Sequence, residues 1–290
     1  MTRRVLLVAH TGRDDINQLT RRIAEPLSRA GVDLVALPGE NDLLGLPCVD
    51  PRPDNSIEMV LGLGGDGTLL RAADKARPID APVLGINLGR VGFLAEADPE
   101  QLDGVIQAVI DRSYTVRERM TVDVLVEHDG VEITRNWALN EVSVEKATRE
   151  RILDVVVEVD GHGISAFGCD GVLIATPTGS TAYAFSAGGP IIWPQVEALL
   201  VVPSNAHALF ARPLVVAPSV EVTVHIDPKG HEAAMACDGR RITELPAGSR
   251  IRVRRGVQPV KMVRLGELPF STRLVRKFAL PVQGWRDKRH

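Results

Sequence analysis

The chain has 290 residues, of which 44% are hydrophobic and 24% are charged, proportions typical of a folded globular protein rather than a disordered chain. Its 34 Lys and Arg residues nearly balance 37 Asp and Glu residues, so the net charge gives no reason to expect nucleic acid or an anionic membrane as a partner. The three cysteines are widely spaced, and no apolar run has the length of a signal peptide or a membrane span. The composition therefore predicts a cytoplasmic protein with reduced thiols.

The first third of the chain alternates between strand and helix patterns. A continuous apolar run at residues 5–9 predicts a buried strand, and apolar residues three and four positions apart, ending at Gly31, predict the helix that follows. Further strands are expected at residues 32–37, 58–63 and 82–87, and further helices at 69–76 and 102–110. This alternation predicts a parallel sheet with helices on its faces. Residues 47–55, with three prolines and no apolar periodicity, are expected to form a mobile loop.

After about Tyr114 the apolar period changes from helical to strand-like. Alternating valines at 122–126 precede Asp129-Gly130, and a second run at 153–159 ends at Asp160-Gly161, so hairpins are expected. Short apolar strands continue to about residue 263. The sequence therefore predicts an α/β domain over residues 1–115 and an all-β domain over 116–268. The last segment, 269–290, is rich in Lys and Arg, which indicates either a solvated basic tail or a segment that docks on the fold.

The segment Gly62–Gly67 has the spacing G-x-G-x-x-G after an apolar strand and before a helical pattern. A dehydrogenase fingerprint would have an acidic residue about 20 positions later, but that position is Asn87, and Asp66 would put a carboxylate against the pyrophosphate. Asp66 is explained if it acts on a hydroxyl beside a metal-bound phosphate held by the glycine amides. The alternative is a glycine turn in which Asp66 only caps the next helix.

A second loop gathers small hydroxyl side chains after a buried-strand pattern at 172–175. It reads Thr-Pro-Thr-Gly-Ser-Thr-Ala-Tyr over residues 176–183. Hydroxyls can bind ribose or phosphate oxygens, and Tyr183 offers a flat face for a base. For any single hydroxyl a helix cap is the better explanation, but the cluster as a whole favours a ligand. Asn140 and Glu141 follow an apolar stretch and together could clamp a vicinal diol. Asp170 either meets the same ligand or stabilises a turn.

Taken together, Gly64–Thr68, Asn140-Glu141 and the run from Asp170 to Pro190 closely resemble the NAD kinase family, in particular its actinobacterial members. The stretch Asn87–Leu94 resembles the family as well. The Gly-Gly-Asp-Gly element is shared with phosphofructokinases and lipid kinases and so indicates only a superfamily. The Thr-Pro-Thr-Gly-Ser-Thr-Ala-Tyr element is the specific one.

The resemblance implies a two-domain fold, with an α/β N-terminal domain, a β-sandwich-like C-terminal domain and a C-terminal segment that returns to the first domain. It implies transfer of the terminal phosphoryl group of ATP, or of polyphosphate in some members, to the adenosine 2′-hydroxyl of NAD. A divalent metal such as Mg²⁺ and a homo-oligomer, dimer or tetramer, are implied too. Gly168 stands where some relatives carry arginine, which implies an open pocket near the nicotinamide and acceptance of NADH.

The same resemblance assigns roles to single residues. Asp66 is implied to be the catalytic residue that orients or deprotonates the acceptor hydroxyl, with Tyr183 stacking on a base. The phosphate-donor loop comprises Gly64, Gly65, Gly67 and Thr68. The residues implied to bind NAD are Gly67, Phe93, Asn140, Glu141, Gly168, Asp170, Thr181, Ala182, Tyr183 and Ser186. No metal ligands are indicated.

Two other functions are compatible with parts of this sequence. A lipid kinase related to the diacylglycerol enzymes would share the Gly-Gly-Asp-Gly loop, but the polar loop at 176–183 favours a polar acceptor. A non-catalytic NAD-binding regulator would have no use for Asp66. Both alternatives are therefore less favoured than a nucleotide kinase.

Overall fold

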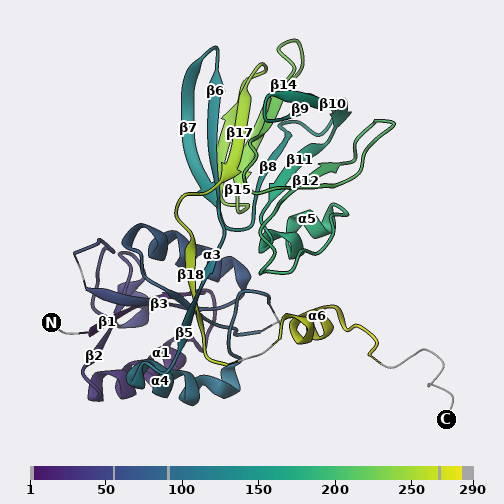
Figure 1. The fold of residues 1–290 in the computed structure, drawn as a ribbon. Coiled ribbons are helices and arrows are strands. Elements are labelled where there is room, and N and C mark those ends of the chain that lie inside the picture. The colour runs from purple at the N-terminus through teal and green to yellow at the C-terminus, as the bar shows by residue number, and fades with distance from the viewer. Residues whose placement is uncertain (1–2, 55, 90–91, 267–268, 283–290) are drawn as a thin grey trace. The chain divides into compact units, whose positions relative to one another are not determined.

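The computed structural model describes residues 3–54, 56–89, 92–266 and 269–282. The chain forms two compact units, residues 1–118 with 260–290, and residues 119–259 (Figure 1). The last eight residues of the predicted C-terminal segment and Asn55 of the predicted loop lie outside the described residues. Within the described part of the chain, no helix has the length and apolar composition needed to cross a bilayer.

The first unit contains one six-stranded sheet in the order β2-β1-β3-β4-β18-β5. Its strands are β1 (Arg3–Ala9), β2 (Val32–Ala36), β3 (Ile57–Leu63), β4 (Val83–Ile86), β5 (Thr115–Arg119) and β18 (Val260–Arg264). The helices are α1 (Ile16–Arg29), α2 (Asn41–Leu44), α3 (Asp66–Ala76), α4 (Leu102–Asp111) and α6 (Phe270–Phe278), with 3₁₀ turns η1 (Arg77–Ile79) and η2 (Pro99–Gln101). The pairs from β2 to β18 are parallel, as the alternation predicts.

The apolar pattern of the first unit follows from burial of its central strands on both faces. The last five residues of β1 and of β3 are all buried, as expected for parallel strands covered by helices. On one face, Ile23 and Leu27 of α1 and Val105 of α4 pack into the same core. The carboxyl ends of these strands then lead into the loops that carry the candidate residues.

The predicted boundaries of the β domain need correction at both ends. The second unit comprises residues 119–259, because β5 and β18 belong to the sheet of the first unit. Met262 of β18 pairs with Val83 of β4 in parallel, and Lys261 lies 2.5 Å from the Asp80 carboxylate. A short apolar strand looks the same in either sheet, so its sequence did not show which unit it completes.

The prediction of a mobile loop at 47–55 also needs correction for its first residues. The Ala36 N–H donates to the Pro47 carbonyl, and the Val49 N–H donates to the Ala36 carbonyl, both at 2.9 Å. Cys48 thereby forms a parallel bridge with Ala36. Proline lacks an N–H but keeps its carbonyl acceptor, so this Pro-rich segment can pair with the sheet edge.

The second unit is a sandwich of two six-stranded antiparallel sheets. One has the order β10-β9-β14-β17-β6-β7 and the other β13-β12-β11-β8-β15-β16. The bounds are β6 (Val122–His128), β7 (Val131–Ala138), β8 (Glu141–Lys146), β9 (Leu153–Val159), β10 (His162–Cys169), β11 (Gly171–Ala175), β12 (Leu199–Ser204), β13 (Leu214–Val216), β14 (Val222–Ile226), β15 (Ala233–Cys237), β16 (Arg241–Leu245) and β17 (Arg250–Arg255). Val124 and Val253 of one sheet share a core with Val172 and Met235 of the other. The predicted sandwich-like fold is confirmed.

The two hairpin signals in this unit form as predicted. Asp129 and Gly130 have φ of 50° and 76°, and Asp160 and Gly161 have φ of 49° and 76°. Positive φ at both central residues is the geometry of a type I′ turn, whose twist matches that of the strands it joins.

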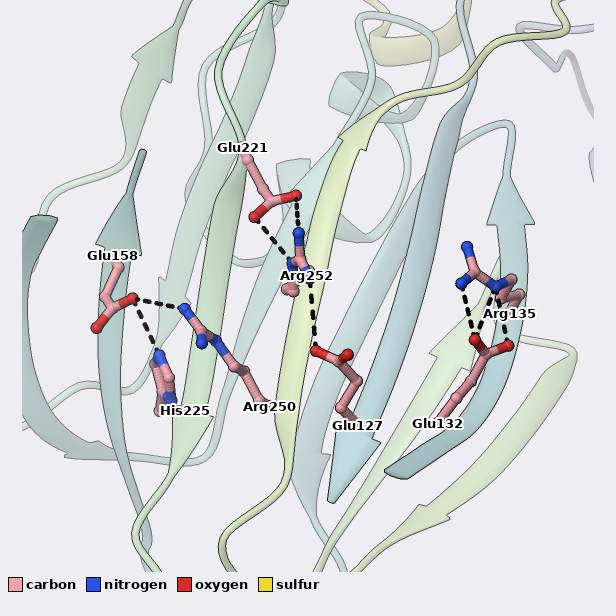
Figure 2. A network of polar contacts seen from close by, with 8 residues as sticks. All are labelled: Glu127, Glu132, Arg135, Glu158, Glu221, His225, Arg250 and Arg252. Atoms are coloured by element: carbon pink, nitrogen blue, oxygen red, sulfur yellow. Dashed lines mark hydrogen bonds and ion pairs between the residues drawn. The ribbon is translucent and has the colours of Figure 1, made fainter. Parts of the chain in front are cut away.

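The outer faces of the two sheets differ in chemistry. The sheet that contains β9 and β17 exposes a network of ion pairs across its strands (Figure 2). Arg252 lies 2.9 Å from Glu221 and 3.5 Å from Glu127, and Glu158 lies 3.0 Å from His225. In contrast, the outer face of β11 is covered by an apolar cluster that includes Ala184. Because β11 is buried on both faces, its sequence is apolar throughout.

The inner and outer faces of β17 predict very different mutational effects at adjacent positions. Ile251 is fully buried in the sandwich core, so Ile251→Ala should reduce the free energy of unfolding by about 2–5 kcal/mol. Arg252→Gln removes solvent-screened ion pairs and should reduce it by less than about 1 kcal/mol. Urea unfolding of the two variants measures the difference. Equal losses would contradict this assignment of faces.

Candidate functional site

The glycine loop of the first unit joins β3 to α3 through a turn that only glycine can make. Gly64 has φ of 156°, and a Cβ added there would lie 2.5 Å from the Thr68 hydroxyl. Its N–H donates to the Ile86 carbonyl at 2.9 Å, which ties the loop to β4. Gly65 and Gly67 are exposed at the N-terminus of α3, where backbone N–H groups and the helix dipole favour a phosphate.

The Asp66 carboxylate is held by the segment that follows β4. The N–H of Phe93 donates to Oδ2 and the N–H of Leu94 donates to Oδ1, both at 3.1 Å. Gly92 makes this approach possible, because a Cβ there would lie 2.3 Å from Oδ1. The N-cap of α3 is Gly65, without a side-chain cap. The alternative in which Asp66 merely caps the helix is therefore wrong.

In the second unit, Asn140 and Glu141 lie where β8 begins, beside the end of β11. The N–H groups of Leu139 and Asn140 donate to the two oxygens of Asp238 at 3.0 and 2.6 Å. The Asn140 carbonyl accepts the Thr176 N–H at 2.9 Å. A Cβ on Gly179 would lie 2.0 Å from that carbonyl. The 176–183 loop therefore packs directly on Asn140, and glycine is required at the contact.

Two buried carboxyl groups in this region have unequal partners. Asp238 pairs with Arg241 at 2.9 Å in addition to its two amides, although burial raises its pKa. Glu141 is 5% exposed; burial, and then the nearby Asp238 carboxylate, raise its pKa to about 8, opposed by the N–H of Tyr183. Its Oε2 is buried without a hydrogen-bond partner. Asp238 therefore has a cation and two amides to stabilise its charge, whereas the Glu141 carboxyl in its protonated form is suited to a hydroxyl ligand.

The hydroxyl-rich loop uses some of its hydroxyls for its own structure. Thr176 donates to the Leu139 carbonyl at 2.6 Å, and Ser180 donates to the Pro177 carbonyl at 2.7 Å. Both side chains are fully buried. The interpretation that the whole cluster faces a ligand therefore needs correction for these two residues.

The remaining loop residues are accessible to different degrees. Thr181 and Ala182 are half-buried, and Tyr183 and Ser186 are exposed, in the short helices η3 (Gly179–Thr181) and α5 (Tyr183–Ser186). Burial of its ring and the Glu145 carboxylate, which is hydrogen-bonded to its hydroxyl, raise the pKa of Tyr183. The residue Tyr183 is 41% exposed, so part of its surface is accessible to a planar ligand.

Asp170 lies in the same region of the second unit, at the start of β11. Lys146 lies 2.6 Å from its carboxylate and Asn205 donates to it at 2.8 Å; these two contacts lower its pKa. Gly168 is opposite Asp154 in the β9–β10 pair, and a Cβ there would lie 2.7 Å from Ile152 and 3.1 Å from the Asp154 carboxylate. An arginine side chain at 168 would therefore start toward Asp154.

Sequence reasoning missed the residues that hold the candidate side chains in place. Asp238 is in an Asp-Gly hairpin turn, with φ of 54° and 64° at Asp238 and Gly239. The dipeptide indicates that turn, but not that its carboxylate binds residues 98 positions earlier. Among the described residues, no three His, Cys, Asp or Glu side chains are grouped to hold a metal ion.

The α/β unit thus carries a phosphate-type glycine loop with an amide-held carboxylate, and the β-sandwich carries buried polar groups and an exposed tyrosine. Two family models match the chain: the ATP-NAD kinase N-terminal domain at residues 46–114 and the ATP-NAD kinase C-terminal domain at 139–265. The chain belongs to the NAD kinase family. The lipid kinase alternative is set aside, because both matched models describe ATP-NAD kinases.

Similar proteins match nearly the whole chain. An NAD kinase of Rhodococcus erythropolis is 52% identical, covering 99% of this chain and 97% of its own. An NAD kinase of Mycobacterium tuberculosis is 51% identical, covering 99% of both chains. The structure of yeast NADH kinase complexed with NADH shares the fold, with a TM-score of 0.86 at 23% identity over 97% of this chain and 89% of that one. An NAD kinase from Archaeoglobus fulgidus in complex with ATP gives 0.73 at 26% identity, covering 96% and 99%.

The raised pKa of Glu141 predicts a pH-dependent gain in stability for Glu141→Gln. The pKa of Glu141 is about 8 in the folded protein, against an ordinary value of 4.5. Between these two pH values Glu141 ionises in the unfolded chain but not in the folded one, so the wild type loses stability as the pH rises. Gln has no such dependence. The difference in melting temperature, variant minus wild type, should widen by roughly 3 °C or more between pH 5 and pH 8.5. Parallel curves would show that folded Glu141 is already ionised at pH 5.

Proposed function

We propose that this chain transfers the terminal phosphoryl group of ATP to the adenosine 2′-hydroxyl of NAD, making NADP, and that it accepts NADH as well. Its membership of the NAD kinase family supports the reaction. The observation that carries the proposal is the Asp66 carboxylate, fixed by two backbone N–H groups at a glycine loop that opens a helix. We propose acceptance of NADH from the family resemblance at Gly168 alone, because Ile152 and Asp154 lie directly beside this glycine.

In this reaction Asp66 is the general base for the 2′-hydroxyl of the acceptor. The exposed backbone of Gly65 and Gly67, with the N-terminus of α3, binds donor phosphates, together with Gly64 and Thr68. Asp66 accepts a hydrogen bond from the 2′-hydroxyl and takes its proton as the oxygen bonds to phosphorus and ADP leaves. The two amides that orient the carboxylate leave its other lone pairs for this hydroxyl.

We propose the following contacts for the dinucleotide. Asn140 and Glu141 bind ribose hydroxyls, and the unpartnered Oε2 of Glu141 supports this role, because a hydroxyl would satisfy it. Tyr183 stacks on a base, and Asp170 serves the nicotinamide end. The other contacts we propose are made by Gly67, Phe93, Gly168, Thr181, Ala182 and Ser186.

ATP is the proposed donor, supported by the archaeal relative solved with ATP, with polyphosphate as the alternative. The resemblance also implies a divalent ion such as Mg²⁺, which would bind the donor phosphates beside the Asp66 carboxylate. Such an ion would neutralise charge on the transferred group.

We also propose a cytoplasmic homo-oligomer, dimer or tetramer. Cys48, Cys169 and Cys237, all of them described residues, form no disulfide, which supports a reducing compartment. Leu209 and Phe210 are adjacent and exposed, which supports a contact with a second copy.

The catalytic role of Asp66 predicts that chemistry fails while binding persists. Purified wild type given NAD, ATP and Mg²⁺ should form NADP, measured with an NADP-specific dehydrogenase. Asp66→Asn should lower kcat by roughly 10²–10⁴-fold, the range for loss of a general base, with NAD affinity near normal by calorimetry. Asp103→Asn, an exposed carboxylate on α4, is the control and should be fully active. Absence of NADP with the wild type refutes the proposed function, and normal turnover of Asp66→Asn removes Asp66 from it.

The exposed ring of Tyr183 predicts different effects for two substitutions. Tyr183→Ala should raise the Kd for NAD by at least roughly 2–13-fold, because stacking contributes about 0.5–1.5 kcal/mol beyond buried area. Tyr183→Phe keeps the ring and loses only the hydroxyl bonded to Glu145, so it should bind almost normally. Calorimetric titration that gave equal losses for both variants would assign binding to the hydroxyl.

A further inference from the structure

The amides of residues 93 and 94, which bind the Asp66 carboxylate, belong to a segment that contacts α6. Each of the two N–H groups lies 3.1 Å from a different carboxylate oxygen, so a rotation of this backbone turns the carboxylate with it. Residues 92–96 are outside any helix or strand, and their position depends on their contacts with neighbouring elements. The groups that hold this segment therefore decide the direction of Asp66.

Arg273 of α6 holds the end of the segment. Its Nη1 donates to the Ala95 carbonyl, and its Nη2 lies 2.6 Å from the Glu96 carboxylate. Glu96 also pairs with Arg264 of β18 at 2.5 Å, which connects the arrangement to the sheet. One planar guanidinium thus binds a backbone carbonyl and a carboxylate at once, a geometry that lysine cannot reproduce.

The same helix holds the beginning of the segment through aromatic contacts. The Phe93 ring lies against Phe270 and Phe278, with centroid distances of 5.9 and 5.8 Å, within the range of favourable aromatic pairs. The rings of α6 therefore contact residue 93, and its guanidinium contacts residues 95 and 96. The two amides that bind Asp66 lie between these contacts.

Packing alone does not account for an arginine at this position. Its side chain is only 4% exposed, and its Nε is buried without a hydrogen-bond partner. Burial lowers its pKa, with the carboxylates of Glu96 and Asp66 acting in the opposite direction. An apolar side chain of similar volume would cover the segment without desolvating a charge.

A cavity lies beside residues 92–96, so no other side chains of the described residues are placed there to substitute for the contacts of Arg273. It has a volume of about 410 Å³ and is lined by Gly92, Ala95 and Glu96 together with Val105, Ala108 and Arg273. On this side the segment faces open space rather than packed side chains. Loss of the guanidinium would therefore leave the segment free to shift.

We propose that Arg273 is a positioning residue for the phosphoryl transfer, fixing the backbone of residues 93–95 so that their amides hold the Asp66 carboxylate in its productive orientation. This inference rests on the proposed function and adds a residue to it that touches neither substrate nor the reacting atoms. The C-terminal helix, distant in sequence from the glycine loop, thereby takes part in catalysis.

The first test compares Arg273→Met and Arg273→Lys with Arg276→Met on the same helix. Arg276 is 3.9 Å from Asp98 and half exposed, and its loss should leave turnover unchanged. Arg273→Met should lower kcat by roughly 10–100-fold, the scale for a displacement of about 1 Å in a reacting group, with KM for NAD and ATP within about threefold. Arg273→Lys should lose less, because it can still pair with Glu96. Normal kcat in Arg273→Met overturns the proposal.

The second test asks whether Arg273 acts through Asp66. In the Asp66→Asn background, with residual transfer followed by labelled ATP, Arg273→Met should lower kcat by less than about twofold further. The same fold-loss in both backgrounds would indicate a general structural effect and overturn the proposal. If Arg273→Met does not fold, Arg273→Lys takes its place in the cycle. If the wild type makes NADP and Arg273→Met lowers kcat by the same factor in both backgrounds, this inference alone is refuted. If the wild type makes no NADP, the proposed function is refuted.

Discussion

A carboxylate that accepts N–H groups from two consecutive residues organises each unit of this protein. In the first unit Asp66 binds the amides of Phe93 and Leu94, and in the second Asp238 binds those of Leu139 and Asn140. In both cases the carboxylate joins two loops that are far apart in sequence. Charge-assisted bonds to successive amides fix direction as well as position, so the remaining candidate residues depend on these two contacts.

The two arrangements use the carboxylate for different purposes. Asp238 is buried and paired with Arg241, and its two oxygens hold the backbone of Leu139 and Asn140 in place. Asp66 is only half-buried and keeps access to solvent and ligand. Glu141 is a third case, because burial without a cation raises its pKa to about 8 and keeps it neutral. Burial and partners, rather than residue type, thus give these three carboxyl groups different environments.

The fold could be predicted where the spacing of apolar residues distinguishes strands from helices. The candidate site could be predicted where several characteristic residues lie close together in the sequence. Continuous apolar runs identified β1 and β3, and Asp-Gly pairs identified the hairpin turns of the sandwich. Period could not show that β18 completes the first sheet, because a short strand has the same pattern in either place. The glycine motif identified Asp66, whose amide contacts the structure then supplied. The contacts of Arg273 and Asp238 span 178 and 98 residues, and nothing local in the sequence marks such distant partners.

The return of the chain to the first unit has a consequence for the order in which the protein can form. The sheet of the first unit is left after β5 and completed only when β18 pairs with β4, once the whole sandwich has been synthesised. Contacts that close such long loops form late. A chain that folds during synthesis can complete its N-terminal part first only if that part needs no later segment. Here the sandwich is the unit formed by one continuous stretch of chain. The glycine loop is therefore synthesised before the sandwich, and the helix that steadies its carboxylate is synthesised after it.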